Sequence, residues 1–198
     1  MAGNVPHARV VTCDLNQQES EAVKFFLTYM DDVQHILRNP RTIQEREEWG
    51  SFQAFISHLD CALSKSTVSQ KVLLYHGISP DLAGTLLFML DLNPLLREGT
   101  VSTEFIPHLI LDPGYTLFTV DPGTMLRNLA GQKRETGVIF TYSGGPGDSA
   151  IVLGKESGEM LYPRDSAWVT TGYSSIRWGT TRLIIISLEK YRGGGGLI

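Results

Sequence analysis

Two acidic residues in the segment GKESGEMLYPR, residues 154–164, are the first candidates for chemistry. Glu156 and Glu159 flank a Ser-Gly pair, and an apolar run that ends at Pro163 follows Glu159 directly. A carboxylate at the first residue of a buried strand is aimed by that strand and reached through the preceding loop. Such a group can stabilise positive charge on a sugar that is losing its leaving group, and one well-placed group contributes about 3 kcal/mol. The alternative is a charged turn that keeps an edge strand in solution.

A histidine and two hydroxyls are further candidates. His76 stands in LLYHG at the end of an apolar run. Gly77 would let a ligand approach the backbone there, while His76 offers a hydrogen bond. Ser102 and Thr103 stand in GTVSTEF, where hydroxyls can fix a ligand or orient a carboxylate. A structural histidine and ordinary strand residues remain the alternative interpretation of both segments.

The elements that must position these residues begin with helices over the first seventy residues. Residues 17–39 predict one helix that ends at Asn39-Pro40, and a second helix follows from about Thr42. We expect the two to pack as an antiparallel pair. Their apolar stripes are Val23, Phe26, Leu27, Met30, Val33 and Leu37 in the first, and Phe52, Phe55, Ile56, Leu59 and Leu63 in the second.

From Val72 onward, strands predominate. KVLLYHGIS indicates a buried strand, and a helix with Ser79 as its N-cap and Pro80 at its first position follows. The stretch from residue 106 to 132 indicates no element beyond two Asp-Pro-Gly turns. The remaining segments have the composition and spacing of an antiparallel β core, and they are GTVSTEF, GVIFTYS, SAIVL, EMLYP, SAWVTTGYS and TRLIIISLEKY.

Composition excludes several classes of protein. The chain has 198 residues, 42% of them hydrophobic, which suits one domain with at most a small accessory lobe. A net charge of −4 without a basic run gives no reason to expect a nucleic-acid partner. Cys13 and Cys61 are expected to be buried or half-buried thiols, because only His58 lies near either as a second zinc ligand. No secretion signal or membrane span is recognised, so we expect a cytoplasmic protein or one delivered into a target cell.

The order of the motifs resembles the ADP-ribosyltransferase superfamily over residues 71–190. LLYHG is similar to that family's first strand, which carries Arg or His, and GTVSTEF is similar to its Ser-Thr-Ser strand. The segment ESGEMLYPR is similar to the loop and strand that bear the catalytic glutamate. Glu104 replaces the last serine of the second motif. Ser157 stands where many arginine-modifying members have Glu or Gln, so arginine is not favoured as the acceptor.

The resemblance implies a fold and its substrate. We expect an α+β protein with a helical N-terminal lobe at residues 1–70 and a split antiparallel β core at residues 71–191. That core would be an NAD-binding mono-ADP-ribosyltransferase of the toxin or effector kind, and residues 192–198 would be a flexible tail. NAD is expected as the substrate, with no metal, and the acceptor is expected to be a protein. No membrane partner is expected.

The resemblance also implies how NAD would be held, bent across a single cleft of the β core. His76, beside Gly77, would hydrogen-bond the adenosine ribose or the pyrophosphate. Ser102 and Thr103 would support the nicotinamide ribose and steer the catalytic glutamate. Tyr75 could offer a stacking surface, with a core role as the open alternative.

The same resemblance implies that Glu159, Ser102 and His76 are the catalytic residues, with Glu159 in the central role. Glu159 would accept a hydrogen bond from a ribose hydroxyl and stabilise the oxocarbenium ion as nicotinamide leaves. Glu156 and Ser157, in the loop from residue 143 to 158, would meet the acceptor.

Three alternatives stay open. Water could replace the acceptor, which would make the chain an NAD glycohydrolase. The altered motifs would also fit a non-catalytic binding module on the same fold. An unrelated α+β hydrolase that uses Glu156 and Glu159 as a carboxylate pair is the third.

Overall fold

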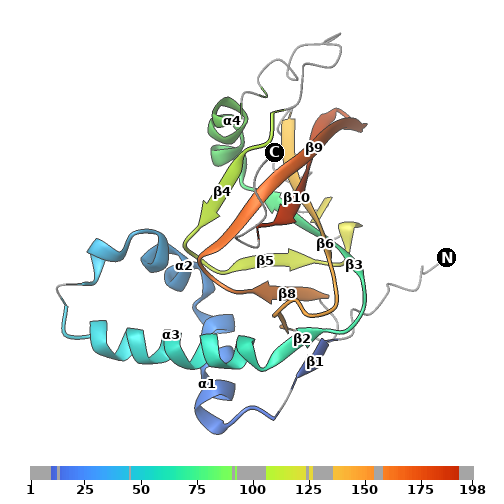
Figure 1. Ribbon diagram of the computed structural model, residues 1–198. Coiled ribbons are helices and arrows are strands. Elements are labelled where there is room, and N and C mark those ends of the chain that lie inside the picture. The colour runs from blue at the N-terminus through green and yellow to red at the C-terminus, as the bar shows by residue number, and fades with distance from the viewer. Residues whose placement is uncertain are drawn as a thin grey trace. The chain divides into compact units, whose positions relative to one another are not determined.

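The computed structural model describes residues 10–12, 14–44, 46–90, 92, 106–123, 125–126, 136–153 and 158–191 (Figure 1). It confirms the predicted α+β class, because helices dominate the first seventy residues and strands the rest. The chain forms two compact units. Unit 1 comprises Met1–Val72, Leu111–Val120 and Gly144–Ser166, and unit 2 comprises Leu73–Ile110, Asp121–Ser143 and Ala167–Ile198. The predicted functional division at residues 70 and 191 stays a prediction.

The helices of unit 1 are α1 (Gln17–Thr28), α2 (Met30–Arg38) and α3 (Trp49–Ser64), with a 3₁₀ turn at Pro40–Thr42. Asn16 caps α1, since its side chain accepts from the Glu19 N–H while the Glu19 carboxylate accepts from the Asn16 N–H. This reciprocal pair fixes where the first helix begins.

Two helix boundaries differ from the prediction. The expected single helix over residues 17–39 is broken at Tyr29, whose φ of −122° and ψ of 31° end α1 and begin α2. The apolar stripe continues through the break, so periodicity does not reveal it. The second expected helix begins at Trp49 instead of Thr42, because the chain first makes the 3₁₀ turn.

The strands of unit 1 form two groups. β1 (Val10–Thr12) pairs with β2 (Ser66–Val68), and β5 (Thr116–Thr119), β8 (Glu159–Tyr162) and β7 (Ile151–Val152) pair in that order, all antiparallel. Figure 1 shows β5 and β8 side by side. The core buries Phe26 of α1 and Leu59 of α3 together with Tyr115 and Leu161. The helices and the β8 strand therefore share one core.

The remaining strands lie mostly in unit 2. Their order is β4 (Leu109–Asp112), β9 (Ser166–Trp178), β10 (Thr181–Lys190), β6 (Thr136–Gly144) and β3 (Val72–Ile78), and α4 spans Pro80–Met89. Ser79 and Pro80 occupy the predicted N-cap and first helical positions of α4. The β9/β10 pair is antiparallel as expected, whereas β10 and β6 run parallel. The parallel pair contradicts the prediction of a uniformly antiparallel β core.

Three further predictions have an outcome. The stretch 106–132 contains β4 and β5, which the pattern did not indicate. Both expected Asp-Pro-Gly turns form, since the N–H groups of Gly114 and Gly123 donate to the carboxylates of Asp112 and Asp121. Cys61 is exposed on α3, so the expectation of a buried thiol is wrong there. Cys13 and the tail at 192–198 lie outside the described residues.

Candidate active site

Glu159 is the first residue of β8, as the sequence predicts. It is partly buried, and the three residues that follow it, Met160, Leu161 and Tyr162, are fully buried. β5 pairs with β8 on one side, with Thr119 opposite Glu159, and β7 pairs on the other. The backbone that carries this carboxylate is thus fixed from both sides, which is what an electrostatic group needs to act without reorganising.

The entry into β8 is fixed by Gly158. Its φ of +61° lies in the left-handed region, and a Cβ built on it would lie 2.6 Å from Cγ2 of Val120. The Val120 N–H donates to the Gly158 carbonyl at 3.0 Å, and the Leu153 N–H donates to the Glu159 carbonyl at 2.9 Å. Only glycine fits this position without moving its neighbour. We name Gly158 and Val120 the entry clamp.

The far end of β8 is tied to α3 through a carboxylate. Arg164 donates from Nε to Asp60 Oδ2 at 3.0 Å, and the Tyr115 hydroxyl donates to Asp60 Oδ1 at 2.8 Å. Burial, with the hydrogen bond to Asp60 second, raises the pKa of Tyr115. Burial lowers the pKa of Arg164, but the hydrogen bond and charge of Asp60 outweigh it and raise the pKa overall. Both groups therefore keep their protons at physiological pH and remain donors to Asp60.

A second tie joins α2 to the residues that lead into β5. The side-chain amide of Gln34 donates to the Tyr115 carbonyl and accepts from the Tyr115 N–H at 3.0 Å. Gly114 leaves room for this amide, because a Cβ there would collide with Gln34 Oε1. Arg38 binds Asp112 with two hydrogen bonds of 3.1 and 3.0 Å. The helices of unit 1 thereby position β5, the partner strand of β8.

His76 lies on β3 in unit 2 and is partly buried, like its neighbours Tyr75 and Gly77. Its ring stacks on Phe140 of β6, with 6.4 Å between centroids and 15° between planes. The imidazole therefore lies nearly parallel to the Phe140 ring. Tyr75 is partly buried and packs against the apolar cluster around Ile139, and its stacking role stays a prediction.

The other predicted site residues lie outside the described part of the chain. They are Ser102, Thr103, Glu156 and Ser157, and Glu104 also lies there. Sequence reasoning missed the roles of Val120, Gln34, Asp60 and Phe140. No local motif marks them, because each acts on a residue far away in the chain. A glycine directly before a candidate acid was the one sequence signal available for the entry clamp.

The described residues contain no group of three His, Cys, Asp or Glu side chains placed to hold a metal ion. They also contain no helix with the length and apolar character needed to cross a bilayer.

Comparison with solved structures decides the fold. Plx2a, an ADP-ribosyltransferase toxin from Paenibacillus larvae, matches with a TM-score of 0.63 and 18% identity over 89% of this chain and 87% of that one. C3larvin, from the same organism, matches with a TM-score of 0.62 and 18% identity over 89% and 96%. The chain has the ADP-ribosyltransferase fold. The family resemblance inferred from the sequence is confirmed at that level.

The enzymatic component C2-I of the Clostridium botulinum C2-toxin also matches, with a TM-score of 0.64 and 13% identity. The match covers 89% of this chain but only 44% of that one. No protein-family model and no curated protein sequence matches the chain.

Proposed function

We propose that the chain is a mono-ADP-ribosyltransferase, which cleaves NAD at the nicotinamide–ribose bond and transfers ADP-ribose to a macromolecular acceptor. One observation carries the proposal: in an ADP-ribosyltransferase fold, a glutamate stands at the first residue of a buried strand held on both sides. The toxins that share the fold are ADP-ribosyltransferases by name. The acceptor is expected to be a protein.

In this reaction the glycosidic C–N bond breaks and its electron pair leaves with nicotinamide. The ribose becomes an oxocarbenium ion, which the Glu159 carboxylate stabilises while accepting a hydrogen bond from a ribose hydroxyl. A lone pair of the acceptor then forms the new bond to the same carbon, and the acceptor's proton passes to solvent. The entry clamp and the tie to Asp60 keep Glu159 in place throughout.

His76 is proposed to bind the adenosine half of NAD, with Gly77 leaving the backbone accessible. Its stack on Phe140 presents the imidazole in one orientation. Ser102 and Thr103 are proposed to support the nicotinamide ribose, and Glu156 and Ser157 to meet the acceptor.

The test is incubation of the folded protein with NAD labelled on its adenylate and with a cell lysate. We expect labelled macromolecules and free nicotinamide, both reduced at least ~100-fold by Glu159→Ala, the scale of losing one preorganised group. Glu47→Ala, at an exposed carboxylate of unit 1, is the control and should leave both unchanged.

Other outcomes separate the alternatives. Nicotinamide release without labelled macromolecules would assign an NAD glycohydrolase. NAD binding without release would assign a binding module. A folded sample that does not bind NAD would overturn the proposal.

A further inference from the structure

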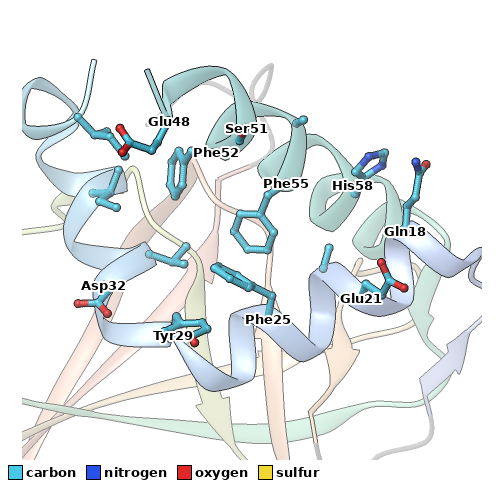
Figure 2. Close-up of a pocket in the computed structure, with 15 residues that line it drawn as sticks. Gln18, Glu21, Phe25, Tyr29, Asp32, Glu48, Ser51, Phe52, Phe55 and His58 are labelled. Carbon is cyan, nitrogen blue, oxygen red and sulfur yellow. The ribbon is translucent and has the colours of Figure 1, made fainter. Parts of the chain in front are cut away.

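An open groove runs along the helices of unit 1. It lies between α1 and α3, closed at one end by the start of α2, and has a volume of about 730 Å³. Figure 2 shows that Phe25 of α1 and Tyr29, the residue that follows α1, face Phe52 and Phe55 of α3 across the groove. We name these four rings and the space they line the aromatic groove.

Two of the four rings, Phe25 and Tyr29, lie outside the core of unit 1, whereas Phe52 and Phe55 pack against it. α1 buries Ala22 and Phe26 against that core, whereas Phe25 and Tyr29 remain 47% and 48% exposed. They lie four residues apart, so they share one side of the helix. Contiguous exposed aromatic surface of this kind marks interaction sites in soluble proteins.

The rings form a continuous ladder across the two helices. The Phe25 centroid lies 4.6 Å from that of Tyr29 and 4.9 Å from that of Phe55, and the Phe55 and Phe52 centroids are 6.0 Å apart. The surface is therefore set before any partner arrives, and little side-chain entropy remains to be lost on binding.

The formal charges that line the aromatic groove have one sign, and His58 lines it as well. Its lining includes three carboxylates, Glu21, Asp32 and Glu48, and no lysine or arginine. Glu48 and Asp32 flank one end and Glu21 lies toward the other (Figure 2). None of the three forms an ion pair with another residue that the structure describes. An occupant must then supply both apolar side chains and positive charge.

We propose that the aromatic groove docks an amphipathic helix of a partner protein, with large apolar residues on one stripe and Lys or Arg beside it. A trough between two helices accepts a third helix, whose anchors recur at every third or fourth residue. α3 has 16 residues and is about 24 Å long, which suits a docked helix of about four turns.

A second copy of the chain fits the groove less well than a basic partner. In a two-fold dimer each groove would face itself, and its carboxylates would approach those of the other copy. Like charges brought together at an interface oppose association. A basic helix meets the same carboxylates with opposite charge.

The probe is a fluorescent synthetic helix of about 18 residues, with leucines on one stripe and lysines elsewhere. Its twin carries glutamate in place of each lysine. We expect fluorescence anisotropy to show binding of the basic peptide, weakened by salt, and at least ~10-fold weaker binding of the acidic twin. Equal binding of the two peptides, or binding of neither, would overturn the proposal.

Two matched pairs of variants locate the binding. Asp31 and Asp32 are adjacent, exposed and both in the first turn of α2, but only Asp32 lines the groove. We expect Asp32→Lys to weaken binding at least ~5-fold and Asp31→Lys to change it less than ~2-fold. Phe25→Ser should abolish binding, whereas Phe88→Ser, at a 73% exposed ring of α4, should preserve it.

All four exposed positions leave the core intact, so circular dichroism should match the wild type for each variant. Equal effects within either pair would contradict the assignment to this groove. Sedimentation that reveals a dimer which Phe25→Ser dissolves would overturn the proposal by assigning the groove to a second copy. Peptide binding is measured without NAD, so it is independent of the proposed transferase activity.

Discussion

Around the strand of Glu159 the structure describes polar bonds from the helices, and around the strand of His76 it describes ring and apolar packing. In unit 1, directional polar bonds from the helices reach the β8 region, through Asp60 to Arg164 and through Gln34 to Tyr115. In unit 2, His76 stacks on Phe140, and Tyr75, the residue before His76, packs against an apolar cluster. A group that must stabilise a developing charge needs fixed geometry, whereas a binding contact tolerates more freedom. In the proposed reaction, the helices of unit 1 would support Glu159 through their hold on β8.

Of the substitutions that test this difference, Gly158→Ala is expected to have the largest effect on activity. The new Cβ would meet Val120 and force the start of β8 to move, which should lower kcat for nicotinamide release about 100-fold, as misplacement near 1 Å does. Gly179→Ala is the control, because Gly179 has a φ of +60° with open space around it. It carries the same backbone penalty without the collision and should retain near wild-type kcat.

A second substitution separates the collision from the backbone penalty. Val120→Ala removes the methyl groups that the new Cβ would meet. In the Gly158→Ala background it should restore kcat at least ~5-fold, because residues in contact are energetically coupled. No recovery would mean that the entry clamp does not position Glu159.

Gln34→Ala should have the next largest effect, and it acts on stability. It leaves the buried N–H and C=O of Tyr115 without their amide partner, which should lower the free energy of unfolding by about 2 kcal/mol. Urea denaturation measures the change. Gln53→Ala, at an exposed residue of α3, should change it by less than about 0.5 kcal/mol. Similar losses of unfolding free energy in both variants would contradict a stabilising tie between α2 and β5.

His76→Ala should act on substrate binding more than on the chemical step. We expect KM for NAD to rise about tenfold while kcat stays within about threefold. This pattern follows the loss of a contact that stabilises bound substrate and transition state equally. Steady-state kinetics at varied NAD measures the split, and His35→Ala on the exposed side of α2 is the control. A fall in kcat with unchanged KM would contradict a binding role and weaken the contrast between the strands.

Substitution of Glu19 should give the smallest effect, a change in stability that is confined to acidic pH. Its bond to Lys65 at 2.6 Å, and then that to the Asn16 N–H, hold its pKa below the ordinary 4.5. The depressed pKa contributes stability that is present above pH 4.5 and is lost as pH falls through the folded-state pKa. Glu19→Gln should therefore flatten the acid limb of a plot of melting temperature against pH. Glu21→Gln, at an exposed residue of α1, should leave the acid limb unchanged.

The local part of the site could be predicted from sequence. An acid before an apolar run ending in Pro163 marked the start of β8, and Ser79-Pro80 marked the start of α4. Both signals lie within a few residues of what they specify. The Asp-Pro-Gly turns belong to the same class, because the aspartate bonds a backbone group two residues away.

The features that sequence reasoning missed depend mostly on partners distant in the chain. β5 has only four residues, and its pairing with β8 gives it strand geometry. The parallel pairing of β6 with β10 likewise joins segments more than forty residues apart. The break at Tyr29 was hidden because the apolar stripe suits one helix or two. Gln34 is the clearest case, since its partner is 81 residues away.

The most direct test is nicotinamide release at saturating NAD by the wild type and by Glu159→Gln, with NAD affinity measured on the same samples. We predict release by the wild type, a rate at least ~100-fold lower for the variant, and NAD dissociation constants within about threefold of each other. Equal release rates in two folded samples would contradict the role of Glu159, and a folded wild type that releases no nicotinamide would contradict the proposed activity.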